Sequence, residues 1–167
     1  KMQKNNHVID FHSHAGNWSR YTMDDDIDSY IHVMDKAGVD IACINCIFNG
    51  DSKIGNDISE TFVSKYPNRF RHVAYVNPHY PENVIEELER CFDQIGSVFI
   101  KIYPEYLRKA NDDPAYIPAY EFANDRKLAI MMHAKFPFDP PELNITERFT
   151  NLSNRFPNIK WVLAHAG

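Results

Sequence analysis

Long hydrophobic runs and an excess of basic charge are both missing from this sequence of 167 residues. No apolar stretch approaches the roughly 18 residues that indicate a membrane span, and the polar start "KMQKNNH" lacks the apolar segment of a signal peptide. We therefore expect a cytoplasmic protein with no membrane partner. The 18 Lys and Arg residues are scattered and outnumbered by 23 Asp and Glu residues, which argues against a nucleic-acid partner.

Cysteine is also scarce, with three residues in the chain. This odd number argues against a disulfide framework. Cys43 and Cys46 form a C-x-x-C pattern, but they lie inside the apolar run "IACINCIF", where a spacing of three sends them to opposite faces of a strand. We do not expect them to form a redox or metal site.

The composition, with 44% hydrophobic and 25% charged residues, is that of a globular protein with the length of one domain. Apolar, β-branched runs alternate with helical patterns, and successive runs start 27 to 31 residues apart. The expected strands cover 7–12, 39–48, 70–78, 97–104, 128–134 and 160–166. The expected helices cover 24–37 and 81–95, which end at Gly38 and Gly96, and more weakly 57–66, 115–126 and 141–155.

This alternation predicts an α/β fold with a parallel sheet, of the TIM-type (β/α)8 barrel class. Such barrels have about 250 residues, and about six βα units fit into this chain. We therefore expect residues 1–167 to form a single, incomplete barrel domain that lacks strands 7 and 8. A doubly wound open sheet is the alternative, but "HSHAGNW" after the first run does not have the glycine pattern of a dinucleotide-binding loop.

Histidines occur where expected strands end. In "VIDFHSHAG", residues 8–16, His12 and His14 are two positions apart and should point to the same side of a strand, as ligands of one divalent metal would. Two histidines in a solvated loop are the alternative. His133 and His165 end the fifth and sixth runs, and in a parallel barrel all four would meet at the carboxyl edge, where such enzymes have their active sites.

Two further polar residues lie in apolar runs. Lys101 in "VFIKIYP" would be buried, and Tyr103 shares its face by alternation. Lys101 either has a functional role or forms a structural pair with an inward acid such as Asp10. Asp10 precedes His12 by two residues and could orient a metal ligand as a hydrogen-bond acceptor.

The motifs "IDFHSH", "KIYP", "MMHA" and "LAHAG" together resemble the metal-dependent amidohydrolase superfamily, in particular the amidohydrolase 2 branch that contains aminocarboxymuconate-semialdehyde decarboxylase. The resemblance implies that His12, His14 and His133 bind the metal, most often one Zn²⁺, with Mn²⁺ or a binuclear site as alternatives. It implies that His165 acts as acid, base or electrostatic stabiliser. Lys101 would be either a carboxylated bridging ligand or an unmodified substrate-binding group. The family's aspartate after strand 8 has no counterpart in this sequence.

The resemblance favours a hydrolase that uses a metal-activated water on a small, carboxylated substrate. A non-oxidative decarboxylase and a noncatalytic barrel remnant are the alternatives. Trp18, Arg20, Lys135, Lys101 and Tyr103 are candidate substrate-binding residues, since cationic groups complement carboxylates. A homo-oligomer, or another chain that completes the barrel, is the expected protein partner.

Overall fold

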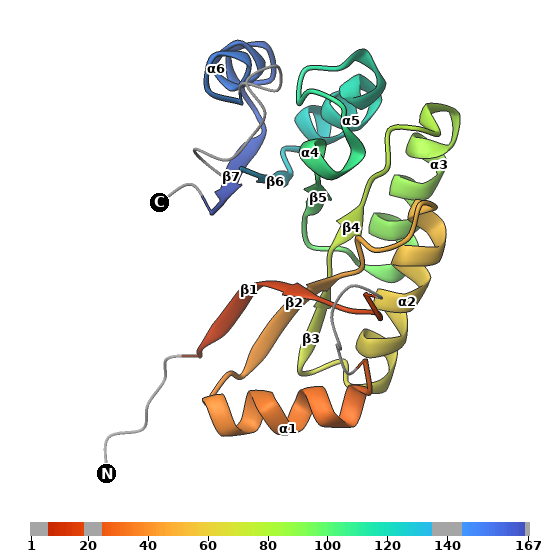
Figure 1. The fold of residues 1–167 in the computed structure, drawn as a ribbon, viewed down its shortest axis with the longest axis vertical. Coiled ribbons are helices and arrows are strands. Elements are labelled where there is room, and N and C mark those ends of the chain that lie inside the picture. Colours follow the sequence, from red (N-terminus) through yellow and green to blue (C-terminus); the bar gives the residue numbers. More distant parts are fainter. Residues whose placement is uncertain (1–6, 19–24, 135–144, 166–167) are drawn as a thin grey trace. The chain divides into compact units, whose positions relative to one another are not determined.

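The computed structural model describes residues 7–18, 25–134 and 145–165. The chain divides into two compact units, residues 1–73 and 74–167, which are described separately (Figure 1). No helix in the described ranges has the length and apolar character needed to cross a membrane.

The first unit is a three-stranded parallel sheet with the strand order β1-β2-β3. Helix α1 connects β1 to β2, and helix α2 connects β2 to β3 (Figure 1). The bounds are β1 Ile9–His14, α1 Ile27–Ala37, β2 Ile41–Asn45, α2 Ser52–Lys65 and β3 Phe70–His72.

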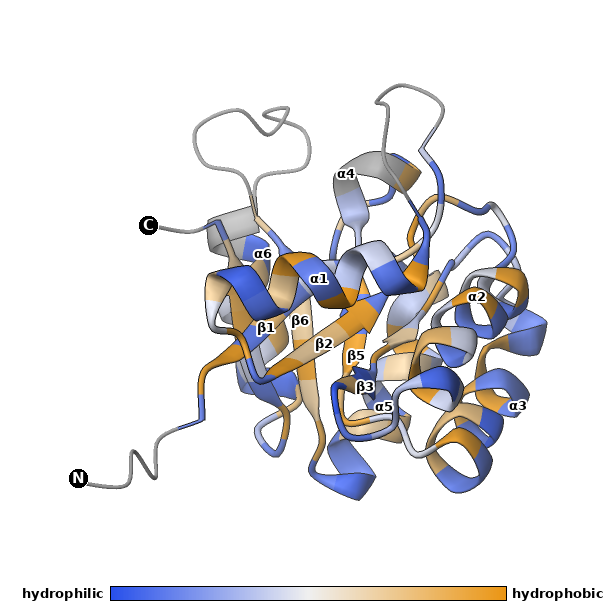
Figure 2. Cartoon of the chain, turned by 90° about the horizontal axis from the view of Figure 1, so that it is seen from below, coloured by the Kyte–Doolittle hydropathy of each residue, from blue (hydrophilic) through white to orange (hydrophobic). Residues whose placement is uncertain are grey.

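Helix α1 confirms the helix predicted over 24–37. The carboxylate of Asp26 caps its first turn by accepting a hydrogen bond from the Ser29 amide, at 2.7 Å. Gly38 ends the helix in the left-handed conformation, with φ at 71°. Hydrophilic and hydrophobic residues alternate along α1, whereas β2 is mostly hydrophobic (Figure 2).

Helix α2 begins at Ser52, five residues earlier than the expected start at 57. Asp51 caps it by accepting from the Lys53 amide. The buried face of its first turns consists of Gly55, Asn56 and Ser59, which are small or polar residues. Such a face gives no apolar periodicity in the sequence, and the predicted start of the helix is therefore five residues too far along the chain.

Aromatic side chains hold the core of the first unit together. Tyr30 from α1, Phe62 from α2 and Phe70 from β3 contact one another edge to face, with ring centroids 5.5 to 5.9 Å apart. They surround Ala42 and Ile44 of β2, which are fully buried. Both helices therefore pack on the sheet through the same cluster.

The second unit is a four-stranded parallel sheet with the order β4-β5-β6-β7. Its strands are β4 Ala74–Tyr75, β5 Ile100–Ile102, β6 Ala129–His133 and β7 Lys160–Ala164. Its helical elements are η1 Pro81–Asn83, α3 Val84–Glu89, the π-helical segment η2 Arg90–Ile95, α4 Pro104–Leu107, η3 Pro114–Tyr116, α5 Ile117–Arg126 and α6 Ile145–Arg155.

The expected strand over 70–78 is divided into β3 and β4. The amide of Val73 donates to the carbonyl of Ile44 in β2, and the next amide, of Ala74, donates to the carbonyl of Phe99, directly before β5, each at 3.0 Å. One predicted strand thus supplies the last strand of the first sheet and the first strand of the second.

Helix predictions in the second unit are confirmed with adjusted bounds. The segment over 81–95 is helical throughout, as η1, α3 and η2, and Gly96 ends it with φ at 86°. The short helix α4, directly after β5, was not predicted. Four residues are too few to produce a periodic apolar pattern.

Gly16, which follows β1, is the position of a first testable prediction. Its φ is 89°, and a Cβ built there would lie 2.8 Å from Sγ of the buried Cys46. We expect Gly16→Ala to lower the free energy of unfolding by about 2–4 kcal/mol, because left-handed backbone strain and overpacking add together. Chemical denaturation measures this change.

Gly50→Ala is the matched control, because a Cβ at Gly50 meets no atom within 4 Å and its φ is not positive. The control should unfold at nearly the wild-type denaturant concentration. Equal midpoints for the two variants would show that the segment after β1 adapts without cost.

Candidate metal centre and active site

The two histidines of "HSH" lie side by side at the carboxyl end of β1. The ring centroids of His12 and His14 are 4.9 Å apart, with the ring planes inclined at 76°. The register of β1 against β2 shifts between Asp10 and Ser13, and such a bulge re-aims side chains at the end of a strand. The pair therefore presents two imidazoles from one strand end, as the sequence predicted.

Asp10 contacts the backbone near this pair. One carboxylate oxygen accepts from the His12 amide at 3.1 Å, and the other accepts from the Ser13 hydroxyl at 2.5 Å. These bonds stabilise the bulge from which both histidine side chains project. The expected role of Asp10, to orient a metal ligand through its ring, stays a prediction.

Asn45, at the end of β2, was missed by sequence reasoning. It is 1% exposed, and its Oδ1 lies 3.1 Å from Nδ1 of His14. Its side-chain amide donates to the Ser13 carbonyl at 3.1 Å. The available signal was a single amide residue within the apolar run "IACINCIF".

Aromatic side chains adjoin the histidine pair. Trp18 stacks on Phe48, with ring centroids 5.1 Å apart and planes inclined at 12°, and Phe48 lies 5.8 Å from the ring of His14. Trp18 was predicted as a substrate-binding residue, whereas Phe48 was not. Arg20, its predicted companion, lies outside the described residues.

A second cluster lies in the other unit, at the ends of β5 and β6. The Nζ atom of Lys101 is 5.5 Å from the ring centroid of Tyr103, and this ring stacks on His133 at 4.0 Å. Lys101 is fully buried, and His133 is 5% exposed. The predicted shared face of Lys101 and Tyr103 agrees with the contact between their side chains.

His165 follows β7 and lies beside His133, with ring centroids 4.9 Å apart. Its φ is 64°, a left-handed conformation that few non-glycine residues adopt and that is often found at functional sites. His165 is exposed and His133 is buried. The pair therefore combines a buried imidazole with one that solvent or a substrate can reach. Lys135 lies outside the described residues.

The predicted metal ligands are divided between the two units, with His12 and His14 in the first and His133 in the second. Within the described ranges, no group of three or more His, Cys, Asp or Glu side chains is arranged to hold a metal ion. The three-histidine ligand set therefore stays a prediction, while each unit contains a close histidine pair of its own.

The three cysteines are free and buried. Burial raises the pKa of Cys43 to about 11 and also raises the pKa of Cys46. Both thiols are therefore protonated near neutral pH, and the thiolate is the form that binds metals and attacks disulfides.

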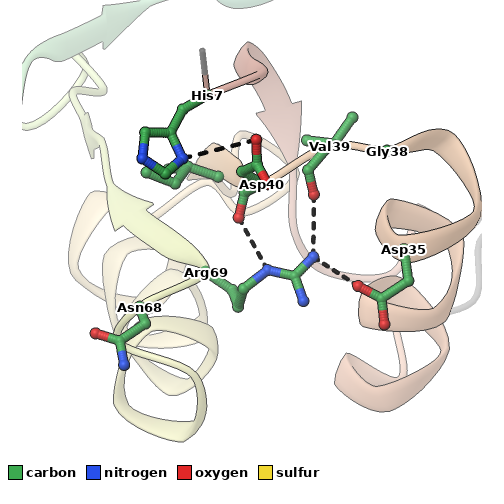
Figure 3. A pocket seen from close by; sticks show the side chains of 8 residues that line it. His7, Asp35, Gly38, Val39, Asp40, Asn68 and Arg69 are labelled. Carbon is green, nitrogen blue, oxygen red and sulfur yellow. Dashed lines mark hydrogen bonds and ion pairs between the residues drawn. The ribbon is translucent and has the colours of Figure 1, made fainter. Parts of the chain in front are cut away.

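A hollow of about 460 Å³ lies at the opposite end of the first sheet, near the start of β2 (Figure 3). The guanidinium of Arg69 crosses it, donates to the carbonyls of Asp40 and Val39, and pairs with Asp35 at 2.8 Å. These bonds tie the start of β2 to the end of α1. The hollow lies at the amino ends of the strands, and this face of a barrel generally serves stability.

Parallel β/α units with histidines at the carboxyl ends of their strands are typical of TIM-barrel metalloenzymes. Residues 9–167 match the model of the Amidohydrolase family, Amidohydro_2, and the chain belongs to this family. The amidohydrolase resemblance and the barrel fold predicted from the sequence are thereby confirmed.

Solved structures with the same fold include 4-oxalomesaconate hydratase from Rhodopseudomonas palustris, with 19% identity and a TM-score of 0.67 over 93% of this chain and 62% of that one. 2,6-Dihydroxybenzoate decarboxylase from Rhizobium has 15% identity and a TM-score of 0.72 over 95% and 66%. A dihydroxybenzoic acid decarboxylase from Polaromonas sp. JS666, with bound manganese and the inhibitor 2-nitroresorcinol, has 19% identity and a TM-score of 0.68 over 95% and 65%. The chain spans less than two thirds of the length of each.

Proposed function

We propose that this chain carries most of the active site of a metal-dependent amidohydrolase-type enzyme that acts on a small, carboxylated substrate. The observation that carries the proposal is the occurrence of a close histidine pair at the end of β1 and another at the ends of β6 and β7. Membership of the amidohydrolase family supports this interpretation. Hydrolysis by an activated water is the first candidate reaction.

His12, His14 and His133 would hold one divalent metal. Neutral imidazole nitrogens suit Zn²⁺, and the manganese in the Polaromonas decarboxylase makes Mn²⁺ the second candidate. A bound divalent ion would polarise a substrate oxygen and lower the pKa of a water ligand. A binuclear site would require carboxylation of Lys101. We propose the single-metal site, in which Lys101 keeps an unmodified amine beside Tyr103.

His165 would move protons at the reacting atoms, since it is exposed and adjoins His133. Lys101 and Tyr103 would bind the substrate carboxylate from β5, and Trp18, Arg20 and Lys135 would line the substrate site. The stacked rings of Trp18 and Phe48 offer an apolar wall for an aromatic or unsaturated acid.

Non-oxidative decarboxylation is the second candidate, favoured by the decarboxylases among the similar structures. In that reaction the bond between the carboxyl group and its neighbouring carbon breaks, and CO₂ leaves. The electron pair stays on that carbon, and His165 would supply the proton that it accepts. The two reactions differ in product, because only decarboxylation releases CO₂ without consuming water.

We further propose that the barrel is completed outside the described residues, by further strands, a second copy or another chain. Val8, Ile9 and Phe11, at the start of β1, are 44 to 53% exposed. Among the described strands, β1 pairs with β2 alone, and an apolar edge of this kind generally pairs further. The completing segment would also supply the family's carboxylate.

We also propose a cytoplasmic location for this protein, since its three cysteines are free.

Elemental analysis of the purified protein tests the proposal. We expect about one equivalent of Zn²⁺ or Mn²⁺ in the wild type and almost none in a His12→Ala/His14→Ala double variant, because two of three ligands are removed. Intact mass is recorded on the same samples. His7→Ala/His32→Ala is the matched control, since both side chains are exposed outside the candidate site.

Two outcomes would change the proposal. Two metal equivalents with a mass gain of one CO₂ would favour a binuclear site with carboxylated Lys101. A folded protein that takes up neither metal would favour the noncatalytic remnant.

A further inference from the structure

Asn45, on the neighbouring strand, forms hydrogen bonds with the residues directly before and after His14. Its backbone carbonyl accepts from the Ala15 amide at 2.9 Å, and its side-chain amide donates to the Ser13 carbonyl at 3.1 Å. The other polar atom of its side chain, Oδ1, lies 3.1 Å from Nδ1 of His14. Bonds to the residues on both sides of His14 therefore fix Asn45 against this imidazole.

The Ser13 carbonyl determines which way the amide of Asn45 points. A carbonyl oxygen only accepts hydrogen bonds, so the NH₂ group must face Ser13, and the Oδ1 atom must then face His14. The reverse orientation would bring two carbonyl oxygens together in a buried place and leave both without a donor.

This orientation dictates the tautomer of the imidazole. Oδ1 of Asn45 only accepts, so Nδ1 of His14 must carry the proton and donate it. In a neutral imidazole the lone pair then belongs to Nε2. A metal binds the unprotonated nitrogen, and the bond made by the other nitrogen fixes which of the two is available.

We propose that Asn45 is a positioning residue that holds His14 in the Nδ1-protonated tautomer and presents Nε2 as the metal-binding atom. The assignment of Nε2 to a metal rests on the proposed function, whereas the assignment of the tautomer does not. An amide acts here as a neutral acceptor, so it orients the ring without placing a negative charge in a buried position.

Nitrogen-15 NMR of the histidine rings in the metal-free protein tests the tautomer directly. For the neutral imidazole of His14, we expect a protonated-type signal for Nδ1 and an unprotonated-type signal for Nε2. The assignment comes from the signals that disappear in His14→Gln. Protonated Nε2 with unprotonated Nδ1 would overturn the proposal, whatever the protein does with metals.

Variants of Asn45 test the consequence for binding. Asn45→Leu removes the acceptor at similar volume, and we expect Zn²⁺ affinity to fall about 10- to 100-fold, the usual effect of losing such a partner. Asn45→Asp keeps an acceptor beside Nδ1 and should restore the tautomer and most of the affinity, but it loses the bond to the Ser13 carbonyl and buries a charge, so its free energy of unfolding should fall below that of the wild type. Competition with a chromogenic chelator measures affinity, and circular dichroism checks that each variant is folded.

Asn49→Leu is the matched control, because Asn49 lies four residues further on and its side chain contacts Cys46. Its Zn²⁺ affinity should equal that of the wild type. Equal affinities for Asn45→Leu and the wild type would overturn the role of Asn45 in metal binding. If the wild type binds no Zn²⁺ while the NMR shows protonated Nδ1, the proposed metal function fails and the tautomer assignment stands.

Discussion

Replacement of His165 by asparagine should lower turnover by about 10²- to 10⁴-fold, the usual contribution of a general acid or base, while metal content stays at the wild-type level. His165 is not among the predicted ligands, and its ring lies beside that of His133. Turnover is measured as CO₂ release and as hydrolysis product from a panel of small carboxylated compounds, the substrate class of the proposed function.

Asparagine suits this test because His165 has a φ of 64°. Asparagine adopts left-handed backbone more readily than most residues, so the turn after β7 should keep its conformation. The variant then differs from the wild type mainly in the loss of a proton-transferring imidazole. The free energy of unfolding should therefore change little, as chemical denaturation would record.

His32→Asn controls for the substitution itself, since His32 is an exposed residue of α1. It should keep full turnover and full metal content. Loss of metal from the His165 variant, in parallel with turnover, would mean that His165 is a ligand. Unchanged turnover with unchanged metal would remove His165 from the chemistry.

The sequence was most informative where one local rule decides the structure. Gly38 and Gly96 end helices in the left-handed conformation, as predicted, because few other residues adopt it at low cost. His12, His14 and His133 lie at strand ends because each terminates an apolar run. The parallel pairing of consecutive strands follows from the alternation of apolar runs with helical patterns along the sequence.

Features that depend on contacts between strands were not predictable. Asn45 reads as one polar residue in an apolar run until its register opposite His14 is known. The division of the third run at Val73 depends on which strand accepts each amide. Lys101 was singled out because a buried lysine is unusual, but its place over the ring of Tyr103 required the structure.

Replacement of Lys101 by methionine should separate a functional role from a structural one. If Lys101 serves the substrate and not a structural ion pair, the free energy of unfolding should stay near the wild-type value, because methionine has a similar volume and no charge to bury. We expect KM for a carboxylated substrate to rise by about 30-fold or more, because losing one partner of a buried charge pair costs about 2–5 kcal/mol.

The alternative, a structural pair between Lys101 and a buried acid, predicts the opposite for stability. Removal of Lys101 from such a pair would leave an uncompensated carboxylate and lower the free energy of unfolding by about 3–5 kcal/mol. Asp10, the acid suggested by the sequence, is exposed and accepts from His12 and Ser13, which weakens that alternative. Lys160→Met, at the exposed start of β7, controls for loss of a lysine in the same sheet. A stable Lys101→Met protein with an unchanged KM would mean that Lys101 has no role in substrate binding. A stable protein with a raised KM would mean that this buried amine is retained for the substrate at a cost in stability.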